Sequence, residues 1–154
     1  MLIVVGLLMA AVEKRGGLVR DLNRVSWGDA MAVGCAQALA LIPGTSRSGI
    51  TITTAMFLGI TRHSAARFSF LLSTPIILGA GLKAFLDSME TGGIPAEMHT
   101  AFAVGVLASA VFGYAVISFF LRYLQRSTLR VFVYYRVILG VIVLALTFLT
   151  SFGR

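Results

Sequence analysis

Charged residues are scarce in this sequence: they make up 12% of its 154 residues, with 6 acidic against 13 basic side chains. A soluble domain carries about 25% charged residues, and disordered chains are also rich in polar residues. With 58% hydrophobic residues, the composition excludes both classes and indicates an integral membrane protein. Cysteine occurs once, as Cys35 in an apolar run, and the two histidines, His63 and His99, lie far apart. We therefore predict no internal disulfide and no metal site in this sequence.

Apolar runs long enough to cross a bilayer, which takes about 20 residues, occur three times. We predict transmembrane helices over residues 65–84, 100–121 and 131–152. The apolar stretch 1–12 is too short to span alone, so we interpret it as the truncated end of a transmembrane helix. The sequence then forms a single membrane domain over 1–154, and we expect it to be part of a longer protein.

Residues 29–60 do not fit a simple span, because a polar turn, Pro43–Gly49 (PGTSRSG), interrupts the apolar residues. At 1.5 Å per residue, each apolar flank reaches only about the middle of the bilayer. Irregular backbone at that depth is tolerated only inside protein or beside a water-filled cavity. We therefore predict a re-entrant helix–turn–helix over 29–60, within an all-α polytopic membrane fold.

Basic residues fall mainly in three connectors between the predicted helices, whereas the loop 87–99 carries acidic residues and no lysine or arginine. The positive-inside rule places the basic connectors in the cytoplasm and the acidic loop outside. The connector cations are Lys14, Arg15, Arg20, Arg24, Arg62, Arg67, Arg122, Arg126 and Arg130. This topology accounts for the net charge of +7 without a nucleic-acid partner.

The turn PGTSRSG combines glycines, hydroxyls and one guanidinium directly before an apolar helical stretch. Backbone N–H groups at a helix N-terminus bind anions, and an arginine fork suits phosphate. All six acids lie in loops or at helix ends, so Arg47 has no carboxylate partner at depth. We predict a phosphate-binding site formed by Gly44, Ser46, Arg47, Ser48, Gly49 and Thr51. It is not a nucleotide-binding P-loop, because Ile50 replaces the lysine.

Two further polar residues lie in apolar surroundings. Gln37, six residues before the turn, either contacts the substrate or bridges two helices, and the sequence leaves both roles open. Arg136 lies near the start of the last predicted helix, and we expect its side chain to snorkel to the cytoplasmic surface.

The segments Gly34–Thr53 (GCAQALALIPGTSRSGITIT) and Arg62–Ala80, with Tyr135-Arg136, closely resemble the second half of bacterial undecaprenyl-diphosphate phosphatases, the bacitracin-resistance family. The resemblance implies a multi-pass enzyme of the bacterial cell (inner) membrane with two inverted repeats, of which this chain is the C-terminal one. It implies hydrolysis of undecaprenyl diphosphate to undecaprenyl phosphate and inorganic phosphate. This reaction recycles the lipid carrier for cell-wall synthesis and gives bacitracin resistance.

The resemblance also implies residue roles. Arg47 and Ser46 take catalytic positions, Thr51 joins Ser46 in hydrogen-bonding the phosphate oxygens, and Gln37 supports them. The base or nucleophile and any divalent cation (Mg or Ca) belong to an N-terminal repeat outside this sequence. We therefore expect the 154 residues alone to be inactive without that repeat or a second copy supplying it. The alternative is a non-catalytic polyprenyl-phosphate binder or transporter, which lacks a Glu-x-x-x-Glu pair upstream.

Overall fold

The computed structural model describes residues 1–90 and 92–152, and every regular element within them is a helix. The α-helices are α1 (Leu2–Arg15), α2 (Trp27–Gln37), α3 (Arg47–Phe57), α4 (Arg62–Glu90), α5 (His99–Arg126) and α6 (Arg130–Phe152). Short 3-10 helices are η1 (Leu22–Arg24), η2 (Ala38–Leu41) and η3 (Ala96–Met98). The predicted all-α class is confirmed.

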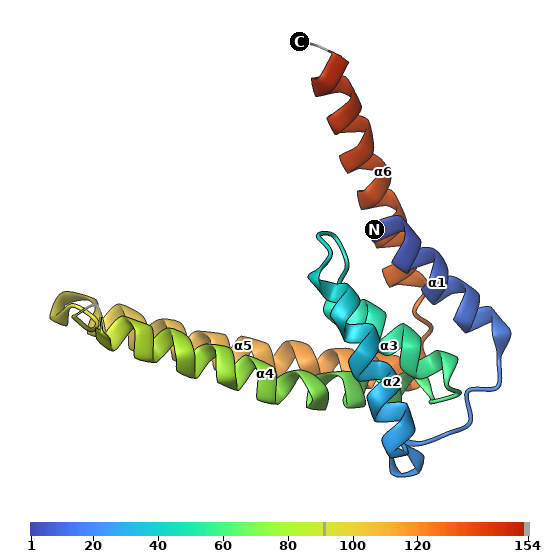
Figure 1. The fold of residues 1–154 in the computed structure, drawn as a ribbon, viewed down its shortest axis with the longest axis horizontal. Coiled ribbons are helices and arrows are strands. Elements are labelled where there is room, and N and C mark those ends of the chain that lie inside the picture. The colour runs from blue at the N-terminus through green and yellow to red at the C-terminus, as the bar shows by residue number, and fades with distance from the viewer. Residues whose placement is uncertain (91, 153–154) are drawn as a thin grey trace.

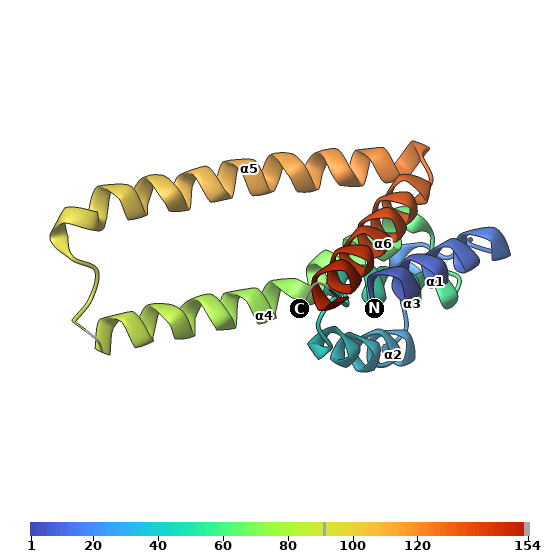
Figure 2. The ribbon, with the colours of Figure 1, turned by 90° about the horizontal axis from the view of Figure 1, so that it is seen from above.

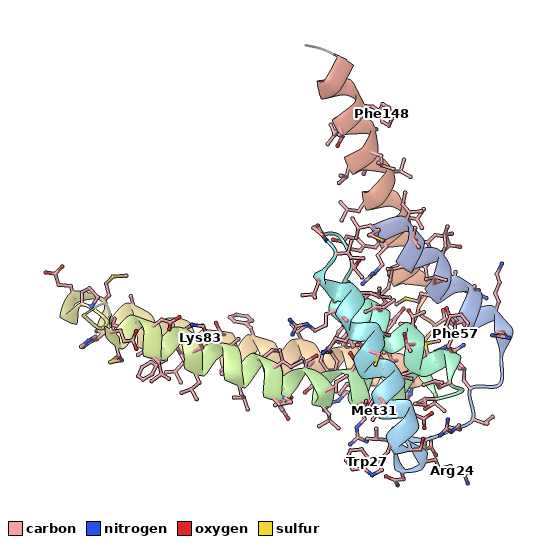
Figure 3. The ribbon with its side chains drawn as sticks, in the orientation of Figure 1. Arg24, Trp27, Met31, Phe57, Lys83 and Phe148 are labelled. Carbon is pink, nitrogen blue, oxygen red and sulfur yellow. The ribbon has the colours of Figure 1, made fainter. Side chains whose placement is uncertain are left out.

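Three of these helices, α4, α5 and α6, are long and apolar enough to cross a membrane. They contain the predicted spans 65–84, 100–121 and 131–152, and α4 and α5 continue beyond them into charged residues. In the most apolar window of each helix, at most 6% of the residues are buried. Their side chains, such as Phe148 on α6, point outward from the ribbon (Figure 3). Such an apolar exterior belongs in lipid, so the chain is a multi-pass membrane protein.

The α4–α5 hairpin extends away from the remaining helices, and α6 leaves the same region in another direction (Figures 1 and 2). Helix α1 lies along the first part of α6. Glycines allow this close approach, because a Cβ on residue 140 would lie 2.6 Å from Cγ1 of Ile3. The predicted stretch 1–12 corresponds to α1, which continues to Arg15 and packs on α6, and its being the truncated end of a transmembrane helix stays a prediction.

Helix α3 lies at the centre of the packing, between α1, α2 and α4. Seven of its 11 residues are buried. Its neighbours bury mainly small and aliphatic side chains against it. The core cluster consists of Met9, Val12, Val33, Ile52, Ala55, Met56, Ile60, Ala65, Ala66, Leu124 and Leu129. The central position of α3 holds its N-terminal turn in a fixed place.

Glu13 joins the ends of three helices. Its Oε1 accepts hydrogen bonds from Nε of Arg62 at 2.7 Å and from the backbone N–H of Leu129 at 2.9 Å. The carboxylate is only 8% exposed, and these charge-assisted bonds compensate its burial. Because α1 ends where α4 and α6 begin, basic connectors from distant parts of the sequence gather at one end of the molecule.

The base of the α2–α3 pair is held by Arg20. Its guanidinium donates to both carboxylate oxygens of Asp29, at 3.1 and 2.6 Å, and to the carbonyl of Leu58 at 2.9 Å. Asp29 also accepts from the backbone N–H and hydroxyl of Ser26, which completes a capping box at the start of α2. The hydrogen bonds from Arg20, followed by those from Ser26, hold the pKa of Asp29 below its usual range.

Candidate functional site

The segment between α2 and α3 turns sharply at Pro43 and Gly44. The backbone N–H of Thr45 donates to the carbonyl of Ile42 at 3.1 Å, and Gly44 has a φ of +82°. Proline followed by a glycine with positive φ is the pattern of a type II turn. Helices α2 and α3 are thus joined through η2 and a tight turn, whereas the re-entrant course predicted for residues 29–60 stays a prediction. We call the segment 42–49 the tip.

Ser46 caps α3 directly after the turn. Its Oγ accepts a hydrogen bond from the backbone N–H of Gly49 at 3.2 Å and lies 3.3 Å from Oγ of Ser48. Arg47 is the first residue of α3, and its side chain is exposed. Within the described residues, no hydrogen bond or ion pair involves the Arg47 guanidinium. The tip thus presents a free guanidinium, hydroxyls and a helix N-terminus together, as an anion site requires.

Arg136 reaches the tip from α6. Its guanidinium lies so close to Gly49 that a Cβ on residue 49 would be 2.6 Å from both Nη1 and Nη2. The side chain is half-buried, and Nη1 is buried with no hydrogen-bond partner among the described residues. A buried cationic donor without a partner is costly, so this geometry suits an anionic acceptor from outside the chain. The expectation that Arg136 snorkels to the cytoplasmic surface is wrong, because its guanidinium fills the space beside Gly49.

An apolar cavity of about 250 Å³ begins at this contact. Its polar wall is formed by Ser48, Gly49 and Arg136. The remaining lining is apolar, from Met9, Ile52, Phe70, Val116, Ile117, Phe120, Leu129 and Phe132. Phe120 packs edge to face against Phe70 and Phe132, with ring centroids 6.0 and 5.1 Å away. The arrangement matches an amphiphile, with an anionic group at the tip and a hydrocarbon chain in the cavity.

The remaining predicted site residues lie differently. Thr51 is fully buried, and its hydroxyl lies 2.9 Å from the carbonyl of Arg47 and 2.7 Å from Oγ of Ser69. Its role in holding phosphate stays a prediction. Gln37 ends α2, and its Oε1 is buried without a partner among the described residues. Both roles that the sequence leaves open for Gln37, substrate contact and helix bridging, stay predictions.

Within the described residues, the hydroxyl of Ser46 has only Ser48 and the backbone N–H of Gly49 as partners, and neither is a base. Nδ1 of His63 lies 3.0 Å from the carbonyl of Leu121, and the residue follows the opposite end of α3 from Ser46. Among residues 1–90 and 92–152, no group of three or more His, Cys, Asp or Glu side chains is arranged to hold a metal ion. The tip itself offers a guanidinium and neutral hydroxyls, which do not match the oxygen anions that Mg²⁺ and Ca²⁺ prefer.

The sequence model of the family described as "Bacitracin resistance protein BacA" matches residues 1–142. Curated relatives named undecaprenyl-diphosphatase match nearly the whole chain. The protein of Thermomicrobium roseum is 46% identical over all 154 residues, which cover 54% of that relative. The proteins of Pelotomaculum thermopropionicum and Geobacter sulfurreducens are 43% and 48% identical, over 99% and 96% of the chain, and are covered to 56% and 55%. The chain thus spans about half the length of these relatives.

Proposed function

Because the chain belongs to the bacitracin resistance protein BacA family, we propose that it forms part of an undecaprenyl-diphosphate phosphatase. The enzyme hydrolyses undecaprenyl diphosphate to undecaprenyl phosphate and inorganic phosphate, which returns the lipid carrier to cell-wall synthesis and gives bacitracin resistance. The contact between Arg136 and Gly49 carries this proposal, because it puts a guanidinium whose Nη1 has no partner among the described residues where the polar tip meets an apolar cavity.

The diphosphate binds at the tip between two guanidinium groups. Arg47 approaches from the start of α3 and Arg136 from α6, while the hydroxyls of Ser46 and Ser48 add neutral donors. The positive end of the α3 dipole lies at the same place. These groups stabilise the charge on the phosphoryl oxygens during phosphoryl transfer, where electrostatic stabilisation is the main task of the protein. Arg47 and Ser46 are the residues of this chain that we assign to catalysis.

The first part of the prenyl chain enters the apolar cavity. Phe70, Phe120 and Phe132 provide its aromatic lining. Hydrocarbon that binds there is removed from contact with water or lipid headgroups and packs against these apolar side chains, which favours binding. With the head fixed at Ser48 and Arg136, the cavity selects diphosphates that carry a hydrophobic tail. A soluble diphosphate would contact only the tip and leave the apolar cavity empty.

The α2–α3 pair enters the bilayer from the cytoplasmic side and returns to it. Each helix has 11 residues, and this corresponds to about 16 Å at 1.5 Å per residue, or half of a hydrocarbon core of about 30 Å. Trp27 at the base is 89% exposed and lies close to Arg24 in the sequence, as in an interfacial belt. We place the protein in the bacterial inner membrane, as one of two inverted repeats.

The other half of the relatives' length supplies what this chain lacks. The base or nucleophile, and the carboxylates that would hold a Mg or Ca ion, come from that half or from a second copy of the protein, because the tip offers no suitable ligands. The residues of this chain bind the diphosphate, orient it and neutralise its charge. The names of the relatives favour this enzyme over a non-catalytic polyprenyl-phosphate binder or transporter.

The test is phosphate release from undecaprenyl diphosphate by the complete enzyme carrying Arg47→Ala. Loss of a catalytic charge contact lowers the rate by about 100-fold or more. Arg126→Ala, which removes an exposed guanidinium at the end of α5, serves as the matched control and keeps the wild-type rate. A wild-type rate for Arg47→Ala contradicts the assignment. Equal losses in both variants show a general charge effect and contradict it as well.

A further inference from the structure

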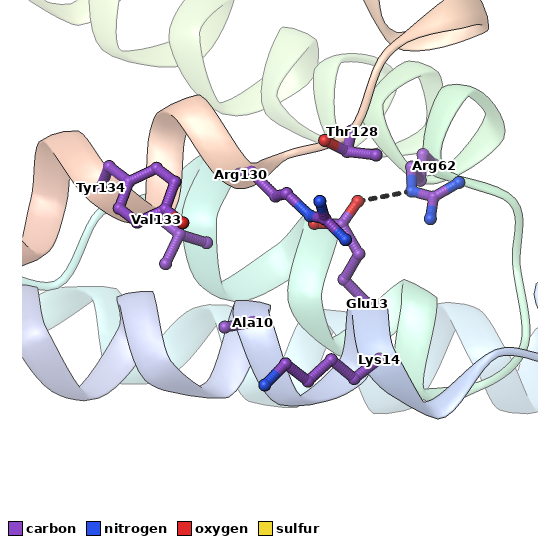
Figure 4. Close-up of a pocket in the computed structure, with 8 residues that line it drawn as sticks. All are labelled: Ala10, Glu13, Lys14, Arg62, Thr128, Arg130, Val133 and Tyr134. Carbon is purple, nitrogen blue, oxygen red and sulfur yellow. Dashed lines mark hydrogen bonds and ion pairs between the residues drawn. The ribbon is translucent and has the colours of Figure 1, made fainter.

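A second concave site lies between α1 and α6, at the end where the basic connectors gather. It has a volume of about 340 Å³ and is lined by Glu13, Lys14, Arg62, Arg130, Val133 and Tyr134, among others. We call it the basic cavity (Figure 4). It shares no lining residue with the apolar cavity beside the tip. It is therefore separate from the proposed diphosphate site.

The charges of the basic cavity do not cancel. Glu13 is already paired with Arg62 and with the backbone N–H of Leu129. Lys14 and Arg130 form no ion pair within the described part of the chain. Figure 4 shows Arg130 reaching from α6 toward the Glu13–Arg62 pair and Lys14 extending along α1. Two positive charges thus face one concavity without a counterion among the described residues.

Two further features match an anion with oxygen acceptors. Arg130 is the first residue of α6, so the positive end of that helix dipole adds to the two side chains. The cavity is also walled by apolar side chains of α1 and α6, Ala10 and Val133, and Tyr134 beside them offers a phenol donor. Ammonium, guanidinium and phenol groups beside an apolar helix surface suit the phosphate of an amphiphile at the membrane surface.

We propose that the basic cavity binds a phosphate group between Lys14 and Arg130. The group is supplied either by the headgroup of an anionic phospholipid or by free inorganic phosphate. This proposal does not rest on hydrolysis at the tip. The geometry on which it depends is the Glu13–Arg62 pair, at 2.7 Å, which neutralises the only carboxylate in the lining and leaves the two outer cations available.

The experiment measures the melting temperature of the protein in uncharged detergent. The probes are phosphatidylglycerol, phosphatidylcholine and inorganic phosphate, titrated separately. A ligand that binds the folded state raises the melting temperature with its concentration, and the titration gives an apparent Kd. The test variant is Lys14→Gln with Arg130→Gln. The control is Arg122→Gln with Arg126→Gln, which removes two exposed charges from α5 without touching the cavity.

We expect phosphatidylglycerol to raise the melting temperature and the test variant to bind it at least about tenfold more weakly, since each lost charge-assisted contact is worth about a factor of ten. The control variant and Arg47→Ala keep the wild-type affinity. A response to phosphatidylglycerol alone identifies a lipid headgroup, and a response to inorganic phosphate as well identifies the phosphate group itself. If the double variant is poorly folded, Lys14→Gln alone replaces it in the titration, because residue 14 is exposed. We expect this single variant to lose part of the affinity for phosphatidylglycerol.

Three results would overturn the proposal. The first is a melting temperature that rises equally with phosphatidylglycerol and phosphatidylcholine, or that rises with none of the three probes. The second is an unchanged Kd in the Lys14 and Arg130 variants. The third is a response that disappears in Arg47→Ala, because the bound phosphate would then lie at the tip. If Arg47→Ala loses phosphate release but its melting temperature still rises with phosphatidylglycerol, both the tip and the basic cavity are supported. The proposed function and the basic-cavity proposal can therefore fail independently.

Discussion

The guanidinium of Arg136 occupies the space that any side chain on residue 49 would need, since a Cβ there would lie 2.6 Å from Nη1 and Nη2. The residue allowed at position 49 of α3 therefore depends on the side chain at position 136 of α6, although the two positions are far apart in the sequence. Glycine at position 49 is required by an arginine rather than by the backbone, which is helical there.

Gly49→Ala tests this dependence. Alanine within a helix normally stabilises it relative to glycine by about 0.5–1 kcal/mol. Here the added methyl group displaces the Arg136 guanidinium, and we expect phosphate release by the complete enzyme to fall by about 100-fold while the protein remains folded. Gly34→Ala on α2 is the control, because nothing lies within 4 Å of its added Cβ. Equal activity of the two variants would argue against a role for the Arg136 contact.

Arg136→Lys separates charge from geometry. Lysine keeps the positive charge but lacks the planar fork that binds two phosphate oxygens at once. We expect the KM for undecaprenyl diphosphate to rise about tenfold or more. Arg122→Lys, at an exposed position on α5, is the matched control with an unchanged KM. An Arg136→Lys enzyme with wild-type KM and kcat would mean that Arg136 serves only as a charge.

Asp29→Asn tests the clamp at the base of the α2–α3 pair. The pKa of Asp29 is lowered by Arg20 and then by Ser26, so its ionised form stabilises the folded state. That stabilisation is fully present above the unfolded pKa of about 3.9 and is lost as the pH falls below that value through the folded pKa. We expect a melting temperature that declines below about pH 4 in the wild type and less steeply in the variant.

At pH 7 the Asp29→Asn variant is less stable by about 1 kcal/mol, because the cap of α2 is weakened. Asp21→Asn provides the control: this residue is exposed, and none of the described ion pairs involves it. Identical acid profiles for Asp29→Asn and the wild type would show that the clamp does not contribute to stability.

Gly140→Ala tests the contact between α1 and α6. The added Cβ would lie 2.6 Å from Cγ1 of Ile3, so the helices must separate, at a cost of about 1–3 kcal/mol. Combining the change with Ile3→Ala removes the clash and restores part of the lost melting temperature. Gly113→Ala on α5, where nothing lies within 4 Å of the added Cβ, does not lower the melting temperature. Independent, additive effects of the Gly140 and Ile3 changes would contradict the contact.

Local sequence patterns predicted the parts of this fold that depend on neighbouring residues. Long apolar runs predicted α4, α5 and α6, and the residues Pro43-Gly44 specify the turn by their own backbone preferences. The capping box of α2 is not among the predicted features, although Ser26 and Asp29 have its three-residue spacing, which is the signal that could have located the start of this helix.

Contacts between residues far apart in the sequence could not be predicted from it. The position of Arg136 in the last helix allows either snorkelling or inward contact. The packing of α6 on α1, which brings the Arg136 guanidinium against Gly49, decides between them. Arg20 was counted as one of many cytoplasmic charges, whereas its partners include Asp29 and the carbonyl of Leu58. A single sequence contains no signal that pairs a loop arginine with these groups.

The carboxylate of Glu13 has a consequence for how the protein is made. Its hydrogen bond to the backbone of Leu129 joins residues separated by 116 positions. At about 5–20 residues per second, the ribosome adds the second partner on the order of 10 s after the first. Helix α1 therefore precedes its partner residue by the time needed to synthesise α4 and α5, and the tip acquires Arg136 only after both of these helices have been made.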